Sequence, residues 1–211
     1  NVMKKMHHFP INAITVFCLV SLASPETRAD NPSDQRLAKM TRAIKAMTVR
    51  PKKSDAPLAD TSQRVPVLRF GDATRQASDG ALWKIGAERP LMMIAMEFTD
   101  SSGELTVNYE FLCLTEEKFE LRTPQGWTWT PQDTALQLKK LPGIAAPNSA
   151  AVVRLRQMKA ASRRFSADEF YQGETFQLRL MPQPIDRYRF GEDGDGAVFA
   201  FVNGTNPEVL L

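Results

Sequence analysis

The chain has 211 residues, of which 43% are hydrophobic and 24% charged, as in ordinary globular proteins. Its formal net charge is only +3, and we find no low-complexity tract and no internal repeat, which excludes disordered and solenoid classes. A core unit of about 150 residues buries about 68–70% of its unfolded surface, which is enough for a stable fold without disulfide or metal staples.

The amino-terminal segment has the pattern of a secretory signal peptide. Lys4 and Lys5 precede an apolar run from Ile11 to Ala23. A membrane-spanning helix needs about 20 apolar residues, so this run is too short to span and fits the central region of a signal peptide. Small-residue cleavage sites end at Ala23 and Ala29. We therefore expect residues 1–29 to be removed, and the mature protein to be periplasmic or extracellular without a transmembrane anchor.

Removal of this segment changes the chemistry that the chain can perform. Both histidines, His7 and His8, lie within it, and Cys113 is the one cysteine that remains. Ser–His and Cys–His nucleophiles and histidine-ligated metal sites are thereby excluded, and no cofactor is expected. Loss of three basic residues and one acidic residue lowers the net charge from +3 to +1. Nucleic acid is therefore not expected as a partner.

Residues 30–64 are expected to form a basic helix and a Pro-rich linker. Apolar residues recur at helical spacing from Leu37 to Met47, with Ser33 or Asp34 as the N-cap. Prolines and charged residues from Pro51 onward predict a linker.

Residues 65–211 are expected to form a single domain. One strong helix is predicted over 150–165, and a short helix is predicted to begin at Ser166–Glu169. Asp79-Gly80 is interpreted as a turn. Strands are predicted over 65–70, 82–85, 91–98, 105–113, 119–122, 127–129, 175–181, 197–202 and 209–211. The fold class is therefore α+β, with a mostly antiparallel meander sheet packed against one main helix and a short N-terminal helix.

Two groups of side chains are candidates for ligand binding. Arg156, Lys159 and Arg163 line one side of the predicted helix, where they either contact an anionic polymer or membrane face or form a solvated surface. Trp127 and Trp129 are two residues apart in a strand and share a face. They either stack on a sugar or partner or pack into the core.

Acidic residues offer the one catalytic alternative. Asp168, Glu169 and Glu174 cluster after the helix, and Glu192, Asp193 and Asp195 cluster near the end. Two such carboxylates can hydrolyse a glycoside if they are held about 5–9 Å apart. The run Asp193–Gly196 resembles the start of a calcium loop but is better interpreted as a hairpin turn, since the later ligand positions are not met.

Several stretches in the carboxy-terminal half resemble an uncharacterised family of exported proteins of planctomycete bacteria. These stretches are Arg154–Met158, Arg163–Ala167, Leu178–Pro184, Arg187-Tyr188, Asp195–Phe201 and Gly204–Leu211. The resemblance covers about Val67 to Leu211 and implies an exported setting. It implies no activity, substrate or catalytic residue.

Together these observations favour a non-catalytic, exported module that binds a protein partner or an envelope polymer. The alternative is an extracytoplasmic, carboxylate-dependent hydrolase. A purely structural envelope protein is a third possibility.

We predict that the exported protein begins at Ser24 or Asp30, because signal peptidase cleaves after small residues. Mass spectrometry of the amino-terminal peptide checks this. An exported form that still begins at Met3 would contradict the prediction.

Overall fold

The computed structural model describes residues 31–51, 65–72, 77–101, 104–132, 139–191 and 194–211. The chain divides into two units at Asn31 and Pro32, and the helices and strands described here belong to the unit Pro32–Leu211. The expected signal peptide and most of the expected linker lie outside the described residues. Within the described residues, no helix has the length and hydropathy needed to span a membrane.

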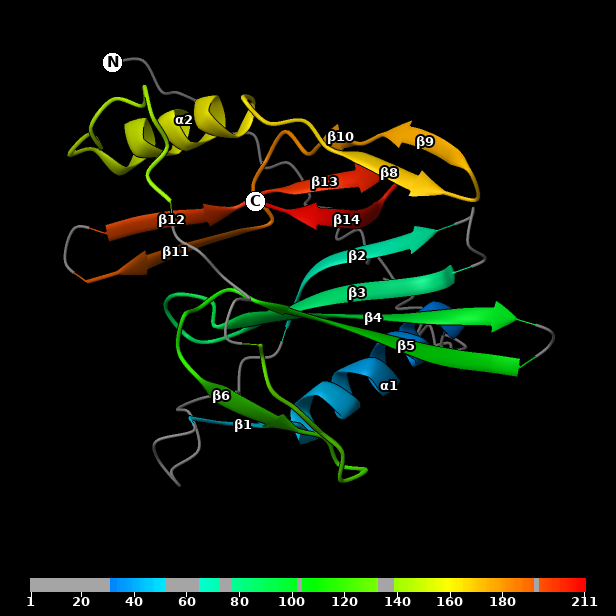
Figure 1. Ribbon diagram of the computed structural model, residues 1–211. Coiled ribbons are helices and arrows are strands. Elements are labelled where there is room, and N and C mark those ends of the chain that lie inside the picture. Colours follow the sequence, from blue (N-terminus) through cyan, green and yellow to red (C-terminus); the bar gives the residue numbers. More distant parts are fainter. Residues whose placement is uncertain (1–30, 52–64, 73–76, 102–103, 133–138, 192–193) are drawn as a thin grey trace, which may run out of the picture. The chain divides into compact units, whose positions relative to one another are not determined.

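The described unit is a mostly antiparallel α+β structure, which confirms the predicted fold class (Figure 1). Its helices are α1 (Pro32–Ala46) and α2 (Ala151–Ser162). Its strands are β1 (Thr48–Pro51), β2 (Pro66–Asp72), β3 (Ala77–Ile85), β4 (Met92–Ser101), β5 (Glu104–Cys113), β6 (Phe119–Arg122), β7 (Thr128–Trp129), β8 (Asp168–Tyr171), β9 (Glu174–Gln177), β10 (Arg179–Leu180), β11 (Asp186–Phe190), β12 (Gly194–Val198), β13 (Ala200–Asn203) and β14 (Asn206–Leu210).

The strands β2, β3, β4 and β5 form an antiparallel sheet in chain order. The central strands β3 and β4 are largely buried on both faces. Trp83 and Ile94 are opposite each other on one face, and Leu82 and Ala95 are opposite each other on the other. Burial on both faces explains why the sequence of β4 is almost continuously apolar instead of alternating.

Helix α1 covers the face that carries Trp83. Its residues Met40 and Ile44 are fully buried there, together with Phe119 and Leu121 of β6. The structure therefore differs from the expectation that α1 belongs to a separate segment, 30–64, beside a domain that begins at 65. The helix packed against this sheet is α1 and not the helix of residues 151–162.

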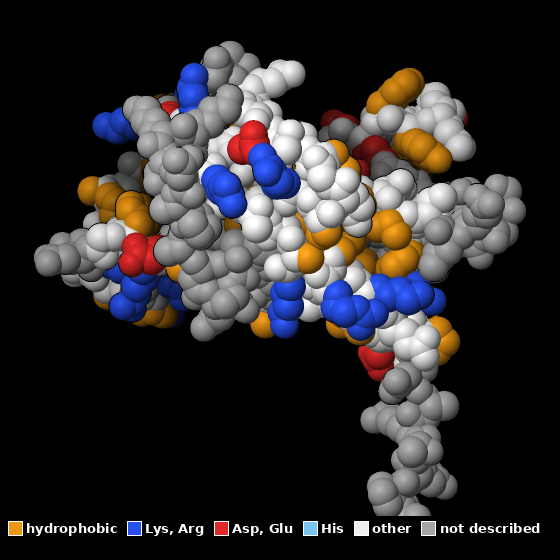
Figure 2. Space-filling model, turned by 90° about the horizontal axis from the view of Figure 1, so that it is seen from below, with side chains coloured by type: hydrophobic (Ala, Val, Ile, Leu, Met, Phe, Trp, Pro, Cys, Tyr) orange, Lys and Arg blue, Asp and Glu red, His pale blue; other side chains and the backbone are white. Residues whose placement is uncertain are grey.

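The outer side of α1 is basic. Figure 2 shows the side of the molecule that lies at the bottom of Figure 1, and lysine and arginine side chains are exposed on it. The exposed basic residues of α1 are Lys39, Arg42 and Lys45. The basic character of this helix is therefore the solvated side of an amphipathic helix whose other side is core.

The second face of the sheet packs against the carboxy-terminal strands. Phe70, Leu82 and Met93 form one apolar cluster with Val198 of β12. Thr205, in the turn before β14, links the same two layers, since its Oγ1 accepts a hydrogen bond from Gly71 N (3.1 Å) and donates one to Gly71 O (2.8 Å). Helix α2 contacts β12. The layers therefore follow in the order α1, β2–β5, carboxy-terminal strands and α2 (Figure 1).

Three local predictions need correction. Ser166–Glu169 does not begin a helix, because Asp168–Tyr171 forms a hairpin with Glu174–Gln177. The strands β1 and β11 were not predicted. Asp79-Gly80 is not a turn but lies inside β3.

The reason for the last error is a close contact across the strands. Gly80 is paired with Phe70, and any Cβ at Gly80 would clash with the Phe70 ring. The same holds for Gly196, which is paired with Tyr188 and lies against its ring. Glycine is present at these strand positions because an aromatic ring of the neighbouring strand occupies the space of a side chain.

We predict that Ile44→Ala lowers the free energy of unfolding by about 2–5 kcal/mol, because it opens a cavity between α1 and the sheet. Urea denaturation followed by tryptophan fluorescence measures the change. The neighbouring exposed residue provides the control, and Lys45→Ala should change the free energy of unfolding by less than about 0.5 kcal/mol. Equal effects of the two substitutions would show that α1 is not part of the core.

Candidate functional site

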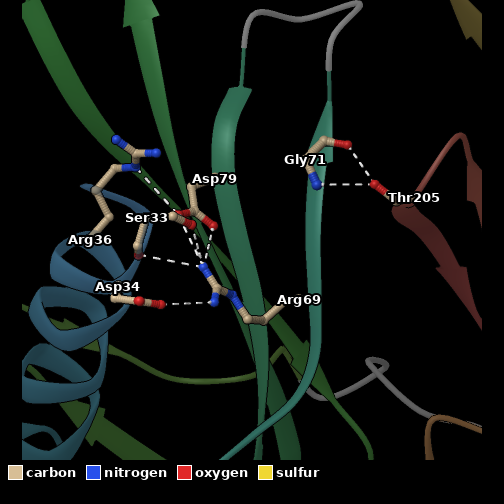
Figure 3. Close-up of polar contacts among 7 residues, drawn as sticks. All are labelled: Ser33, Asp34, Arg36, Arg69, Gly71, Asp79 and Thr205. Carbon is tan, nitrogen blue, oxygen red and sulfur yellow. Dashed lines mark hydrogen bonds and ion pairs between the residues drawn. The ribbon is translucent and has the colours of Figure 1, made fainter. Parts of the chain in front are cut away.

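A buried carboxylate ties α1 to the sheet (Figure 3). The side chain of Asp79 is 6% exposed and lies between two arginines. Arg36 Nε of α1 is 3.3 Å from Asp79 Oδ2, and Arg69 Nη2 of β2 is 3.1 Å from Oδ1. Ser33 donates a hydrogen bond of 2.5 Å to Asp79 Oδ2, and Arg69 also lies 3.7 Å from Asp34. We call Arg36, Arg69 and Asp79 the first clamp.

The same arrangement anchors α2. The side chain of Asp195 is 2% exposed, and its Oδ2 is 3.3 Å from Arg154 Nε of α2 and 3.2 Å from Arg187 Nη2 of β11. Arg154 also donates hydrogen bonds to the carbonyl oxygens of Asn148 and Ser149, just before the helix. We call Arg154, Arg187 and Asp195 the second clamp. In both clamps the helix arginine uses its Nε atom and is the more buried of the two arginines.

The two clamps reveal an internal repeat, although no repeat was expected from the sequence. The first copy reads Arg-Leu-x-x-Met at 36–40, Arg-Phe at 69–70 and Asp-Gly-Ala at 79–81. The second copy reads Arg-Leu-x-x-Met at 154–158, Arg-Tyr at 187–188 and Asp-Gly-Ala at 195–197. In each copy, a helix packs on one face of a hairpin and the aromatic ring faces the shared apolar cluster on the other. Burial in that cluster raises the pKa of Tyr188, an effect that Arg89 opposes and Asp186 adds to.

The three basic residues predicted as candidates on α2 differ in exposure and in their contacts. Arg156 and Arg163 are exposed, and the side chain of neither makes a hydrogen bond or ion pair with another described residue. They are seven residues apart, so they lie on the same side of the helix, about 10 Å from each other along its axis. Lys159 is half-buried and donates a hydrogen bond to Gln183. The guanidinium groups of Arg156 and Arg163 are therefore the cations of this helix that have no partner among the residues that the structure describes.

A largely apolar groove of about 520 Å³ runs along the inner side of α2. Met158, Ala161 and Phe165 line it from the helix, and Ala197 and Phe199 line it from the carboxy-terminal strands. The remaining lining residues are Lys139, Lys140, Leu141, Pro142, Ser162 and Leu211. None of its described lining residues is acidic, and its volume is within the range of ordinary small-molecule sites. We call it the α2 groove.

A smaller pocket of about 130 Å³ adjoins the α2 groove and shares Met158 and Ala161 with it. Arg154, Gln157 and Asp195 bring polar groups to this pocket. Because Asp195 is already bound by two arginines, this carboxylate is not available as a general base. The groove therefore has an apolar body with the second clamp at one end and two lysines among its lining residues.

The predicted tryptophans lie elsewhere, against β5. Trp129 is half-buried and stacks on Phe111 at 5.3 Å, whereas Trp127 is 41% exposed and meets Tyr109 and Phe111 edge-on at 6.0 and 5.6 Å. Burial raises the pKa of Tyr109 above its ordinary value. Trp129 completes the core on this side, and Trp127 covers the cluster with one part of its ring open to solvent. Neither tryptophan is among the described residues that line the two pockets beside α2.

Asp168 and Glu174, two of the acidic residues considered for hydrolysis, do not face each other. Asp168 is paired with Gln177 and Glu174 with Tyr171, so Asp168 and Glu174 lie on opposite faces of the β8–β9 hairpin. Glu169 accepts a hydrogen bond from Asn203, and neither pocket beside α2 is lined by any of these three residues. Among the described residues, no group of three or more His, Cys, Asp or Glu is arranged to hold a metal ion. Glu192 and Asp193 lie outside the described residues.

Sequence reasoning missed the groove and both clamps. The repeated Arg-Leu-x-x-Met and Asp-Gly-Ala motifs were a signal that could have found the clamps. No family model, curated protein or solved structure matches this chain.

Proposed function

We propose that the protein is an exported, non-catalytic binding module whose ligand-binding surface is the outer side of α2 together with the α2 groove. Its setting would be the periplasm or the cell exterior, as the amino-terminal segment and the resemblance to exported planctomycete proteins suggest. The partner would be an anionic envelope component.

The observation that carries this proposal is the pair of exposed guanidinium groups of Arg156 and Arg163. Surface arginines in a domain commonly pair with a neighbouring carboxylate, but these two have no such partner among the described residues, and α2 contains no acidic residue. Two unpaired cations on one side of a helix attract anions, and the effect weakens as salt screens it. The adjoining groove adds apolar surface to the same region.

The hydrolase alternative receives no support from the geometry. It requires two carboxylates that face each other across a cleft, and Asp168 and Glu174 lie on opposite faces of one hairpin. The buried carboxylates Asp79 and Asp195 are each bound by two arginines. A structural role for these groups accounts for their burial without catalysis.

We predict that Arg156→Ala/Arg163→Ala weakens binding of the mature protein to heparin, used as a soluble anionic polymer, by about three- to tenfold at low salt. The loss should shrink as salt is raised, because the interaction is between exposed charges. Surface plasmon resonance on immobilised heparin measures both.

The matched control is Lys39→Ala/Arg42→Ala, which removes two exposed positive charges from α1 and leaves α2 intact. Its affinity for heparin should stay at the wild-type value. If the two double variants weaken binding equally, net charge alone governs the interaction and the α2 surface has no special role. Hydrolysis of the polymer by the wild-type protein would contradict the non-catalytic proposal.

A further inference from the structure

Comparison of the two copies of the internal repeat identifies the α2 groove as a helix–hairpin interface. In the first copy, the helix–hairpin interface is closed, because Met40, Ile44 and Trp83 are fully buried and Phe119 and Leu121 of β6 complete the packing. The groove occupies the corresponding interface of the second copy. It is therefore a helix–strand interface that the described side chains leave partly open.

Substitutions between the copies account for the open space. Counting from the shared Arg-Leu-x-x-Met motif, Ser162 is in the position of Ile44 and Phe165 in that of Met47. Ile44 fills the first interface, whereas Ser162 is smaller and its hydroxyl donates to Lys159 O. Met47 is 2% exposed, whereas Phe165 is 41% exposed beside the groove. No described strand takes the part of β6 in the second copy.

The lining of the groove restricts the chemistry of what can fill it. Its body consists of aliphatic and aromatic side chains, so an apolar ligand would be favoured there. The polar lining side chains are Lys139, Lys140 and Ser162, and the hydroxyl of Ser162 is already engaged. An extended peptide would bring backbone N–H and C=O groups that these side chains do not satisfy. A hydrocarbon chain has no such groups along its length.

The two lysines in the lining determine which charge the polar end of the ligand should carry. Lys139 and Lys140 are exposed, and neither has a hydrogen bond or ion pair with another described residue. Because the described lining residues include two lysines and no carboxylate, they favour a negative group and disfavour a positive one. From these features we infer that the α2 groove binds a free, single-chain fatty-acid-type anion, its acyl chain between α2 and Phe199 and its carboxylate beside Lys139 and Lys140. This ligand class rests on the proposed binding role of the α2 surface.

Isothermal titration calorimetry of the mature protein with octanoate, decanoate and dodecanoate, each below its micelle concentration, tests the inference. Burial of one methylene group is worth about a fourfold gain in affinity, so each step of two methylenes should tighten binding by up to about fifteenfold until the groove is filled. Dodecyltrimethylammonium has a similar chain with the opposite charge and should bind at least tenfold more weakly than dodecanoate. An affinity independent of chain length, or equal for the cation and the anion, overturns the inference.

Two neighbouring alanines of α2 provide a matched pair of variants. Ala161 lines the groove, whereas Ala160 is exposed and does not line it. Ala161→Phe should reduce the affinity for dodecanoate at least tenfold, because the ring occupies the space of several methylenes, and Ala160→Phe should leave it unchanged. Lys139→Gln/Lys140→Gln leaves the groove volume intact and should weaken dodecanoate binding about three- to tenfold at low salt. This variant keeps the test valid if Ala161→Phe fails to fold.

The outcomes separate this inference from the proposed function. Dodecanoate binding that is sensitive to Ala161→Phe, without heparin binding, supports the groove ligand and removes the polymer. Heparin binding without any dodecanoate binding supports the proposed binding module but overturns the inference of a fatty-acid ligand. Binding of an acidic, apolar peptide in the groove with no binding of dodecanoate overturns it in favour of a partner segment. Concentration-dependent dimerisation that Ala161→Phe abolishes, again with no dodecanoate binding, overturns it in favour of a second copy.

Discussion

A buried aspartate shared by two arginines is the interaction around which each half of this fold is arranged. One arginine comes from a helix and the other from a strand, so the carboxylate fixes where the helix lies on its hairpin. Burying a carboxylate is unfavourable unless its charge is neutralised and it accepts hydrogen bonds; Asp79 accepts them at both oxygens, and Asp195 accepts two at Oδ2. The adjacent glycine then allows an aromatic ring from the neighbouring strand to close over the hairpin on its other face. Orientation of the helix and packing of the strand are thereby set by the same short motif.

The two copies of this motif have the same anchor but different packing behind it. Helix α1 buries Met40 and Ile44 against a large sheet, so apolar contacts as well as ion pairs hold it. Among the residues of α2, Ser162 is the one that is fully buried, and the apolar side of the helix borders an open groove. The helix of the first copy is thus part of the core, whereas the helix of the second copy borders a groove that is open to solvent.

Much of the fold could be predicted from local pattern, and the parts that could not depend on contacts between distant residues. Alternation in β5 and the apolar run of β4 indicated their strands, and helical spacing indicated both helices. The same spacing does not show which helix covers which sheet, so α1 was placed in a separate segment. Asp-Gly has a strong turn tendency, which the clamp and the covering ring override at Asp79-Gly80. Arg156 and Arg163 were named as candidates from spacing alone, and the structure leaves them exposed. The groove could not be anticipated, because it is lined by three segments that are far apart in the sequence.

Hydrogen exchange followed by mass spectrometry on Asp79→Asn and Asp195→Asn tests most directly whether the clamps anchor the helices. Asparagine has the shape of aspartate but removes the charge that holds both arginines. Each substitution should speed amide exchange in its own helix, α1 for Asp79 and α2 for Asp195. The increase should be larger in α2, which has less apolar packing to retain it. If amide exchange in both helices stays as slow as in the wild-type protein, the clamps do not anchor the helices, and the repeated motif does not fix their position.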